Sequence, residues 1–346
     1  MKKNTRFAFN AYLQQLARLN GVAVEELSSK FTVEPSVQQT LEDQIQQSAA
    51  FLTLINVTPV TEQSGQLLGL GVGSTIAGTT DTTAKEREPV DPTLMVDVEY
   101  KCEQTNFDTV LTYAKLDLWA KFQDFQVRIR DAIVKRQALD RIMIGFNGVK
   151  RAKTSNRSEN PLLQDVNKGW LQKIREDAPD HVMGSTTTGA VKVGKGGEYA
   201  NLDAVVMDAV NELIDVVYQD DDDLVVICGR ELLSDKYFPL VNKEQENSEK
   251  LAADMIISQK RMGGLQAVRA PFFPPNALLI TRLDNLSIYW QEDTRRRSVI
   301  DNPKRDRIEN FESVNEAYVV EDYRCAALVE NIQISDFSAA AAETGA

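Results

Sequence analysis

Histidine is almost absent from this sequence, since His181 is the only one among 346 residues. A zinc site of the HExxH type therefore cannot be built, and Ser-His-Asp or Cys-His catalysis would have to run through His181. This residue lies in DAPDHVMGS, beside a stretch of flexible composition, where a histidine is usually just solvated. We therefore predict no catalytic role for it.

Cysteines and long apolar runs are also scarce. Cys102, Cys228 and Cys325 lie far apart within apolar stretches, which predicts buried free thiols made in a reducing compartment. No stretch of about 18 apolar residues occurs, so no membrane-spanning helix is predicted. The basic N-terminus is not a secretory signal, because polar residues such as Asn10 and Arg18 interrupt any apolar core.

Positive charge is in short supply as well. The formal net charge is -12, and so acidic a chain is a poor candidate for wrapping nucleic acid, which needs clustered Lys and Arg. Residues 1–30 are the exception, with a net charge of +3 that leaves -15 for the remainder. We interpret them as a small basic appendage on an acidic body. One side of its short predicted helix is formed by Phe9, Leu13, Leu16 and Leu19.

The sequence does contain an unusually long helical pattern. Between Leu116 and Gly148 there is no proline, and apolar residues recur at steps of three and four. We predict one helix over residues 117–147, roughly 45 Å long at 1.5 Å per residue. Asp117 would be its N-cap and Asn147 its last residue. The predicted apolar face consists of Leu118, Phe122, Phe125, Ile129, Ala132, Leu139, Met143 and Phe146.

A second pattern predicts a projecting arm. An apolar strand near residues 52–60 leads into residues 61–93, which are rich in Gly, Thr and charge. The return segment LMVDVEYKCE alternates apolar and polar residues, as in a strand with one buried face. A two-stranded hairpin alone is marginally stable in water, so the arm is expected to lie on something else. A neighbouring subunit is the natural candidate.

The remainder has the pattern of a compact α/β domain at about residues 200–300, in a chain whose length suggests about two domains. A glutamine-rich helix is predicted before residue 52, a short helix in NPLLQDVNKGWLQKIRED, and a flexible connector in STTTGAVKVGKGGEY. The α/β region would contain a helix with Leu202, Val206, Ala209, Leu213 and Val217 on one face, the buried strand LVVIC, helices near 231–238 and 248–259, and the strands LQAVRAPFF and ALLITRL. A β-rich run, NEAYVVEDYRCAALVENIQISDF, follows.

The sharpest enzyme-like signal is GAVKVGKGG. Gly189, Gly194 and Lys195 fit the G-x-x-x-x-G-K spacing of a phosphate-binding loop. However, Gly196 stands where Ser or Thr should hold magnesium, and no apolar strand leads into the loop. A glycine-rich connector that matches by chance is the better interpretation. A nucleotide-binding enzyme that uses Gly189–Lys195 is the alternative from a different functional class.

Three further stretches also favour structural interpretations. Asp220–Asp223 lack the alternating ligands and closing Glu of a calcium loop, so we expect a solvated turn. Arg295-Arg296-Arg297 have acidic neighbours, which favours an inter-subunit ion pair or a solvated face over contact with nucleic acid. GLGVGSTIAG lacks the G-x-G-x-x-G spacing of a dinucleotide site. We therefore predict no enzyme, catalytic residue, metal or cofactor.

Several long strings resemble one known family. These strings are TRFAFNAYL, KFTVEPSVQQTL, LDLWAKFQDFQ, GFNGVKRA, NPLLQDVNKGWLQ, DLVVICGRELLSDKYFP and AADMIISQKRMGGL. They resemble the major capsid proteins of peduoviruses, the P2-like temperate phages, from about residue 4 to about residue 337. The resemblance implies the Hong Kong 97-type phage capsid fold, an α+β fold with an N-terminal arm, an extended β-hairpin loop, a peripheral domain with a long spine helix, and an α/β axial domain.

The resemblance also implies how the chain is divided. Residues 1–30 resemble the basic segment that this family removes during maturation with a phage protease, which places the cut around Lys30, Phe31 and Thr32. The other implied segments are the N-terminal arm (31–60), the extended loop (61–104), the peripheral domain (105–199) with its spine helix (117–147), the axial domain (200–305), the return to the peripheral domain (306–337) and a disordered tail (338–346).

The implied function is structural. Such a chain would self-assemble into hexamers and pentamers that form the icosahedral, DNA-containing head of a tailed phage, assembled in the bacterial cytoplasm. The implied partners are other copies, a scaffolding protein with protease activity, a portal, and packaged double-stranded DNA without sequence-specific contact. The acidic body would keep that DNA from adhering to the shell. The alternative among shell proteins is a cellular nanocompartment of the same fold, which the removable basic segment disfavours.

Overall fold

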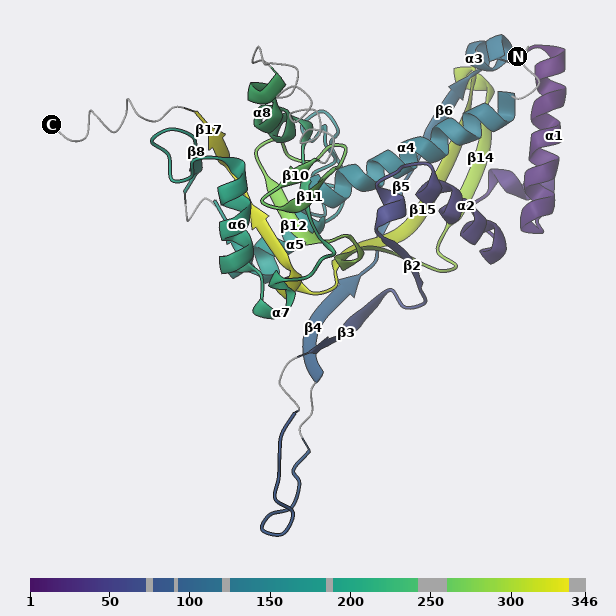
Figure 1. Cartoon of the computed structure of the whole chain (residues 1–346). Coiled ribbons are helices and arrows are strands. Elements are labelled where there is room, and N and C mark those ends of the chain that lie inside the picture. Colours follow the sequence, from purple (N-terminus) through teal and green to yellow (C-terminus); the bar gives the residue numbers. More distant parts are fainter. Residues whose placement is uncertain (73–76, 90–92, 120–124, 185–188, 242–259, 336–346) are drawn as a thin grey trace.

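In this computed structural model, a long helix runs beside two sheets, and a hairpin projects away from both (Figure 1). The structure describes residues 1–72, 77–89, 93–119, 125–184, 189–241 and 260–335. Each sheet takes strands from distant parts of the chain, so contacts between residues far apart in sequence hold the fold together. No helix in this described part is long and apolar enough to cross a membrane.

The larger sheet has seven strands and joins the N-terminal arm to the last third of the chain. Its main path is β1 (Phe31–Thr32), β14 (Arg296–Asn302), β15 (Arg307–Val320), β13 (Leu286–Gln291) and β2 (Asn56–Val60), and β5 (Glu103–Asn106) and β6 (Thr109–Thr112) also pair with β15. All these pairs are antiparallel except that of β13 with β2.

The smaller sheet has six strands. Their order is β10 (Arg261–Met262), β11 (Leu265–Arg269), β9 (Leu224–Cys228), β12 (Leu278–Arg282), β16 (Ala326–Val329) and β7 (Val182–Met183). Every residue of β9 is buried, which confirms the predicted buried strand. The sheets do not divide at the predicted segment boundaries. β13 and β14, from residues 200–305, join the larger sheet, and β16, from residues 306–337, joins the smaller one, because alternation reveals a strand but not its partner.

The described helices cover these sheets and connect them. They are α1 (Lys3–Asn20), α2 (Pro35–Gln47), α3 (Tyr113–Trp119), α4 (Phe125–Asn147), α5 (Trp170–Asp177), α6 (Leu202–Leu213), α7 (Val216–Gln219) and α8 (Arg230–Val241). The predicted glutamine-rich helix is α2, which has Pro35 in its first turn, where a missing N–H does no harm. In α6 the Asn201 side chain caps the helix by accepting a hydrogen bond from the Ala204 N–H at 2.9 Å.

The single helix predicted over residues 117–147 is described as two helices, α3 and α4. α4 ends at Asn147, as predicted, but Phe122 and its neighbours in 120–124 lie outside the described residues. The prediction that Asp117 is an N-cap is wrong, because α3 begins at Tyr113 and includes Asp117. Leu118 is 62% exposed and so belongs to no buried face of this chain.

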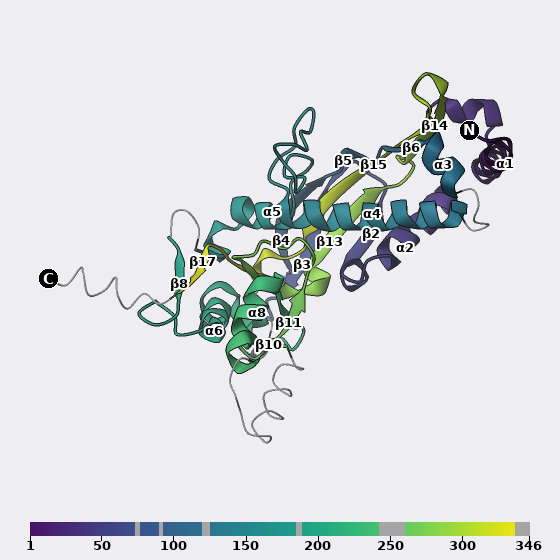
Figure 2. The same ribbon diagram turned by 90° about the horizontal axis from the view of Figure 1, so that it is seen from above.

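Seen from above, α4 crosses the molecule beside α2 (Figure 2), and its buried side also differs from the predicted stripe. Ala132 is exposed, whereas Val134, Ala138 and Ile142 are buried at steps of four residues. Arg141 is fully buried on this helix as well. A pattern of apolar residues alone could not locate this face, because a buried arginine forms part of it.

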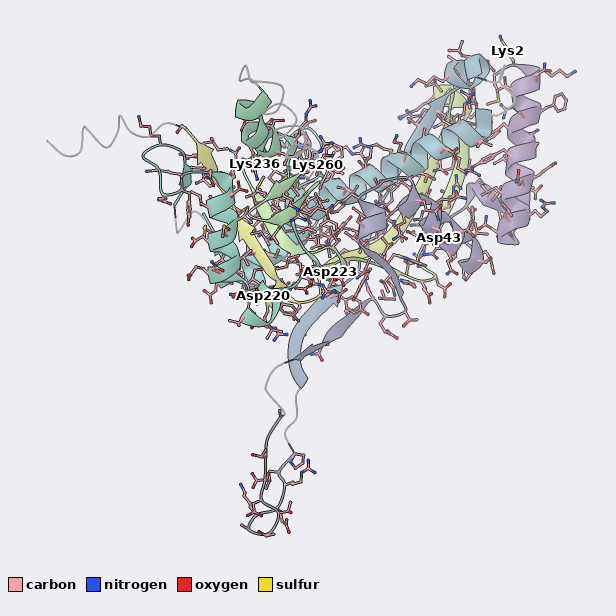
Figure 3. The ribbon with its side chains drawn as sticks, viewed as in Figure 1. Lys2, Asp43, Asp220, Asp223, Lys236 and Lys260 are labelled. Carbon is pink, nitrogen blue, oxygen red and sulfur yellow. The ribbon has the colours of Figure 1, made fainter. Side chains whose placement is uncertain are left out.

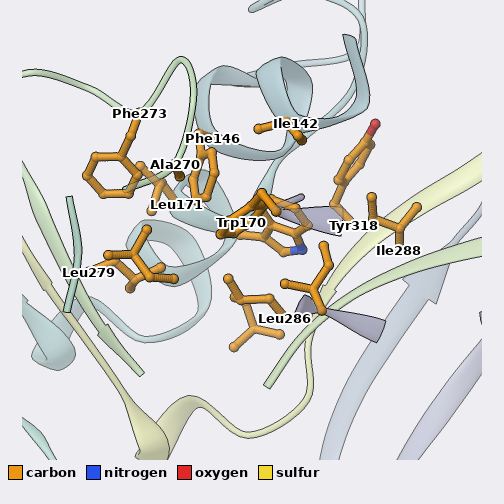
Figure 4. Packing of buried hydrophobic residues seen from close by; sticks show 14 of the residues in the cluster. Ile142, Phe146, Trp170, Leu171, Ala270, Phe273, Leu279, Leu286, Ile288 and Tyr318 are labelled. Atoms are coloured by element: carbon orange, nitrogen blue, oxygen red, sulfur yellow. The ribbon is translucent and has the colours of Figure 1, made fainter. Parts of the chain in front are cut away.

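The main core lies between α4, α5 and the two sheets, with Trp170 near its centre (Figure 4). The indole ring meets Phe146 and Tyr318 edge-on, with centroid distances of 5.1 and 5.5 Å. Its Nε1–H donates a hydrogen bond to the Ser287 carbonyl at 2.9 Å. A glycine is required opposite the ring, because a Cβ at Gly145 would lie 2.2 Å from it.

The predicted arm is confirmed as a two-stranded hairpin. β3 (Ser64–Val72) pairs antiparallel with β4 (Thr93–Lys101) in a sheet of their own. The hairpin leaves the body below the larger sheet and extends far from it (Figure 1). Its described tip, residues 77–89, is exposed throughout.

Three smaller predictions need correction or fall outside the structure. The flexible connector contains a strand, β8 (Val191–Val193), which pairs in parallel with β17 (Ile332–Ile334). Val217 is 58% exposed, because α6 ends and a separate short helix, α7, carries this residue. The predicted helix near 248–259 and the tail 338–346 lie outside the described residues.

Candidate functional site: the docked N-terminal segment

The predicted cut region lies at the edge of the larger sheet. In β1, Phe31 is opposite Arg297 of β14, and Thr32 is opposite Arg296. Phe31 is only 8% exposed, whereas Lys30 and Thr32 are exposed. Successive side chains of a strand point to opposite faces, so Phe31 points inward and its two neighbours point outward.

Helix α1 packs over the inward face of this strand. One apolar cluster contains residues from both sides of the cut region and from the body: Leu16, Ala17, Leu27, Phe31, Val33, Tyr113, Leu116, Val299 and Ile308. Phe9 and Leu13 are partly buried against it, as predicted, but Leu19 is 48% exposed. The basic segment is therefore docked on the body through an apolar face, which the hydrophobic effect stabilises.

An ion pair adds to this docking. Arg6 of α1 pairs with Asp301 of β14, and the Tyr113 hydroxyl donates a hydrogen bond to the same carboxylate. The bond to Asp301 raises the pKa of Tyr113, because the phenol is a donor only while it keeps its proton. Asp301 thus holds α1 and the start of α3 together.

Two further polar contacts position α1 on the body. The Arg297 Nη2 donates to the Tyr12 hydroxyl at 2.9 Å. Near the chain terminus, the Lys2 backbone N–H donates to Asp117 at 2.8 Å, and this bond lowers the pKa of Asp117. These contacts lie at the start and in the middle of the helix, so together they position its first half on the body.

A hydrogen-bonded turn ties the end of α1 to the chain beyond the cut region. Gly21 has a φ of +63°, the left-handed conformation that commonly ends a helix. The Asn20 side chain donates to the Leu16 carbonyl at 2.9 Å and accepts from the Glu34 N–H at 3.2 Å. Residues on both sides of the cut region are therefore bonded to each other directly.

Five buried charged residues lie beneath the N-terminal arm. Arg141 of α4 donates to Glu42 of α2 at 2.6 and 3.1 Å, and to Glu316 of β15 at 2.5 and 2.8 Å. Arg295, just before β14, pairs with Glu42 and with Glu312 of β15. None of the five is more than 4% exposed. Glu42 therefore joins α2 to the long helix and to the sheet at once.

The charges of this cluster do not balance, since two arginines face three glutamates. Burial acts to raise the pKa of Glu42, but Arg141 and Arg295 outweigh it and lower that pKa to about 2. Among the described residues, the Glu316 side chain hydrogen-bonds to Arg141 alone, and its Oε2 has no hydrogen-bond partner. Burial therefore prevails over the attraction of Arg141 and raises the pKa of Glu316. Of Glu42 and Glu316, Glu316 is therefore the one whose carboxyl group more readily keeps a proton.

The arginine run 295–297 has a different role from the one predicted. The prediction of an inter-subunit ion pair or a solvated face is wrong for Arg295, because this residue is fully buried and pairs with Glu42 of its own chain. Arg297 bonds to Tyr12 and to Asn310 at 2.7 Å, and only Arg296 is exposed. These partners are distant in sequence, so the acidic neighbours of the run misled the prediction.

Comparison with known proteins decides the family. The family described as "Phage major capsid protein, P2 family" matches residues 8–332. The chain is 58% identical over 357 residues to the "Capsid proteins" of Escherichia phage P2, with 100% of each covered. The chain belongs to the P2 family of phage major capsid proteins. It is also 40% identical to the "Major capsid protein" of Serratia phage KSP20, covering 96% of this chain and 97% of that one.

Solved structures agree with this assignment. A chain of the "Satellite phage P4 procapsid including size determination (Sid) protein" is 55% identical, with a TM-score of 0.81 and coverage of 98% of this chain and 100% of that one. A capsid chain of an empty GTA particle has 14% identity and a TM-score of 0.51, which shows the fold alone. The P2-family chain thus has the predicted α+β, Hong Kong 97-type capsid fold and is a structural protein of the phage head.

In this capsid protein, Gly189, Gly194 and Lys195 do not form a phosphate-binding loop. Strand β8 lies between the two glycines and pairs with β17, so its backbone is engaged in a sheet. The Gly194 N–H donates to the Tyr199 carbonyl at 2.8 Å. A phosphate loop needs such N–H groups free and aimed at the ligand, so the geometry gives the nucleotide-binding alternative no support.

The other polar candidates have structural roles. Asp220–Asp223 form the turn before β9, at the surface of the body, as predicted (Figure 3). Within it, Asp221 accepts hydrogen bonds from Arg282 at 3.0 Å and from the Asp223 N–H at 2.9 Å. His181 is half-buried, and its Nδ1 is buried without a hydrogen-bond partner among the described residues. Among the described residues, no three His, Cys, Asp or Glu side chains are grouped so that they could hold a metal ion.

All three cysteines are buried free thiols, which confirms that prediction. Burial raises the pKa of Cys102 to about 12 and the pKa values of Cys228 and Cys325 to about 11. Such thiols stay protonated and poorly reactive at neutral pH.

Sequence reasoning missed the buried charge cluster entirely. Its signal was a charged residue among the core positions of a helix: Arg141 directly precedes the buried Ile142, and Glu42 lies three residues before the buried Ile45. A charge on a buried stripe implies a buried partner, because an unpaired charge there is very unfavourable. The identity of that partner could not be obtained from the sequence.

Proposed function

We propose that this capsid protein assembles with copies of itself into hexamers and pentamers that close into the icosahedral head of a tailed phage. It acts by binding and not by catalysis, and it needs no cofactor. The observation that carries this proposal is the projecting hairpin. Among the described strands, β3 and β4 pair only with each other, so their long edges are free for contacts between subunits (Figure 1).

Where the structure describes side chains of the two strands, the base of the hairpin is anchored to its own chain. Tyr100 packs edge-on against Tyr289, with ring centroids 5.2 Å apart, and the Cys102 N–H donates to the Gln63 carbonyl at 2.7 Å. Beyond this base, two strands without a third strand or an apolar support are marginally stable in water. A neighbouring copy beneath the hairpin would provide that support, and the same contact would link adjacent subunits.

The N-terminal segment is the part expected to change during maturation. In this proposal a scaffolding protein with protease activity guides assembly and cuts the chain in the region Lys30–Thr32. The exposed side chains of Lys30 and Thr32 at the sheet edge support this position. Upstream of the cut, only noncovalent contacts, those of α1 and of the short helix Val24–Ser28 with its buried Leu27, would hold residues 1–30 to the body.

Removal of residues 1–30 would change the charge of each subunit from -12 to -15. Phosphates are repelled by a surface of this sign, so packaged DNA would be enclosed without adhering and without sequence-specific contact. A portal at one vertex would admit and release that DNA. The resulting head is a container whose inner surface does not hinder ejection.

Shortening the hairpin tests the proposal. Replacing residues 70–95 with Asn-Gly keeps the anchored base and removes the projecting part. Coexpressed with the scaffolding protein from the same genome, this variant should have the wild-type thermal midpoint and remain unassembled in electron micrographs. The matched control is Gly78→Ala at the tip, where an added Cβ meets nothing within 4 Å, and which should still form shells. Closed shells in normal yield from the shortened chain would contradict the proposal.

A further inference from the structure

The two faces of β1 differ in access. Phe31 is buried in the apolar cluster under α1, whereas Lys30 lies on the opposite face, beside an open cleft of about 300 Å³. That cleft is also lined by Arg296, Ser298 and Phe311, the last of which is 42% exposed. A protease can therefore approach Lys30 from outside. The next side chain, that of Phe31, is buried and cannot enter a protease site in this conformation.

The backbone around this position is held as firmly as the Phe31 side chain. Phe31 and Thr32 pair with β14, and the Val33 N–H donates to the Arg295 carbonyl at 2.9 Å. Proteases bind their substrates as extended strands, with several residues seated on each side of the cut. A paired edge strand with a buried side chain must first open locally, and cutting then follows the population of the opened form.

We propose that α1 acts as a cover that controls removal of its own segment. In this inference, which rests on the proposed cut region, the chain near Lys30–Phe31 becomes a protease substrate only when α1 lifts from the body. Lifting α1 uncovers Phe31 and frees β1 to leave the sheet edge. The contacts of α1 therefore set the rate of maturation.

Two kinds of contact hold the cover closed. Leu16, 8% exposed, is one of the apolar contacts of α1 with the body. Arg6 and Tyr12 are the polar ones, through Asp301 and Arg297. By contrast, Phe7 is 62% exposed and lies outside the apolar cluster, so its truncation should leave closure unchanged. Substitutions at Leu16, Arg6 and Tyr12 therefore test the inference, and a substitution at Phe7 of the same helix is the control.

The test measures cutting of the Lys30–Phe31 bond by lysyl endopeptidase, followed by mass spectrometry of the fragment that begins at Phe31. Cutting at Lys85, which is exposed at the hairpin tip, is the internal reference. Relative to that reference, Leu16→Ala should accelerate cutting at least about tenfold, because large-to-small changes in a packed cluster open it strongly. The double variant Arg6→Ala with Tyr12→Phe should accelerate it about two- to fivefold, as expected for partly exposed polar pairs. Phe7→Ala should match the wild type.

Equal cutting rates in the wild type, Leu16→Ala and the double variant would overturn the inference. If Leu16→Ala fails to fold, the double variant decides the question alone. A parallel coexpression with the phage protease separates the two proposals. Should that protease cut elsewhere, the proposed cut region fails, while the endopeptidase rates still decide whether α1 is a cover. Natural cutting at Lys30–Thr32 with no rate difference among the variants would refute only the cover.

Discussion

Replacing Arg141 with methionine should destabilise this capsid protein far more than the same change at Arg136, on the same helix. Arg141 is fully buried and makes four hydrogen bonds to Glu42 and Glu316. Its removal leaves three buried glutamates with one arginine, Arg295. Arg136 instead pairs with Asp140 one turn away while 56% of its side chain is exposed.

The magnitudes separate the two variants clearly. Removing one partner of a buried ion pair costs about 3–5 kcal/mol, whereas an exposed pair contributes about 0–1 kcal/mol. Unfolding entropy near 60 °C is about 2.1 cal/mol/K per residue, or about 0.7 kcal/mol/K for 346 residues. Arg141→Met should therefore lower Tm by about 4–7 °C and Arg136→Met by less than about 1.5 °C.

The assay is thermal and urea unfolding of the unassembled chain, with equal m-values required before the midpoints are compared. Adding Glu316→Gln to Arg141→Met should recover part of the loss, because one uncompensated carboxylate disappears. If Arg141→Met unfolds at the same temperature as Arg136→Met, the buried cluster does not stabilise the fold in the way described.

Three further predictions follow from burial. The pKa of Glu42 in the folded protein is about 2, below its ordinary value of 4.5, so the stabilisation by this carboxylate is complete above about pH 4.5 and is lost as the pH falls toward 2. Urea midpoints at pH 3 and pH 6 should therefore differ less in Glu42→Gln than in the wild type. A thiol reagent at pH 8 should modify none of the three cysteines until urea unfolds the chain, and rapid reaction of one equivalent would contradict their burial. Gly145→Ala should lose about 1–3 kcal/mol of stability or more, because its Cβ would lie 2.2 Å from Trp170, while Gly78→Ala should lose none measurable.

Much of the fold could be predicted from local patterns. The hairpin, the buried strand β9 and the end of α4 follow from alternation, continuous apolar runs and a terminal Asn-Gly. Strand partners could not be predicted in this way. β16 joins the smaller sheet and β2 the larger one through pairings with distant segments, and the sequence of a strand does not identify its partner.

The candidate site shows the same limit. The resemblance indicated Lys30, Phe31 and Thr32 as a region, but only the structure shows Phe31 buried under α1 while its neighbours are exposed. The cluster around Arg141 was also hidden, because its members lie far apart in sequence and meet only after α2, α4 and β15 pack together. Buried ion pairs are tertiary features, so a single sequence carries only their isolated charges.

The most direct test of the central claim is cryo-electron microscopy of particles formed by the wild-type chain with its scaffolding protein. The account predicts closed icosahedral shells in which β3–β4 of each subunit lies across a neighbouring copy. Soluble monomers with no shells, or shells in which the hairpin touches only its own subunit, would contradict it.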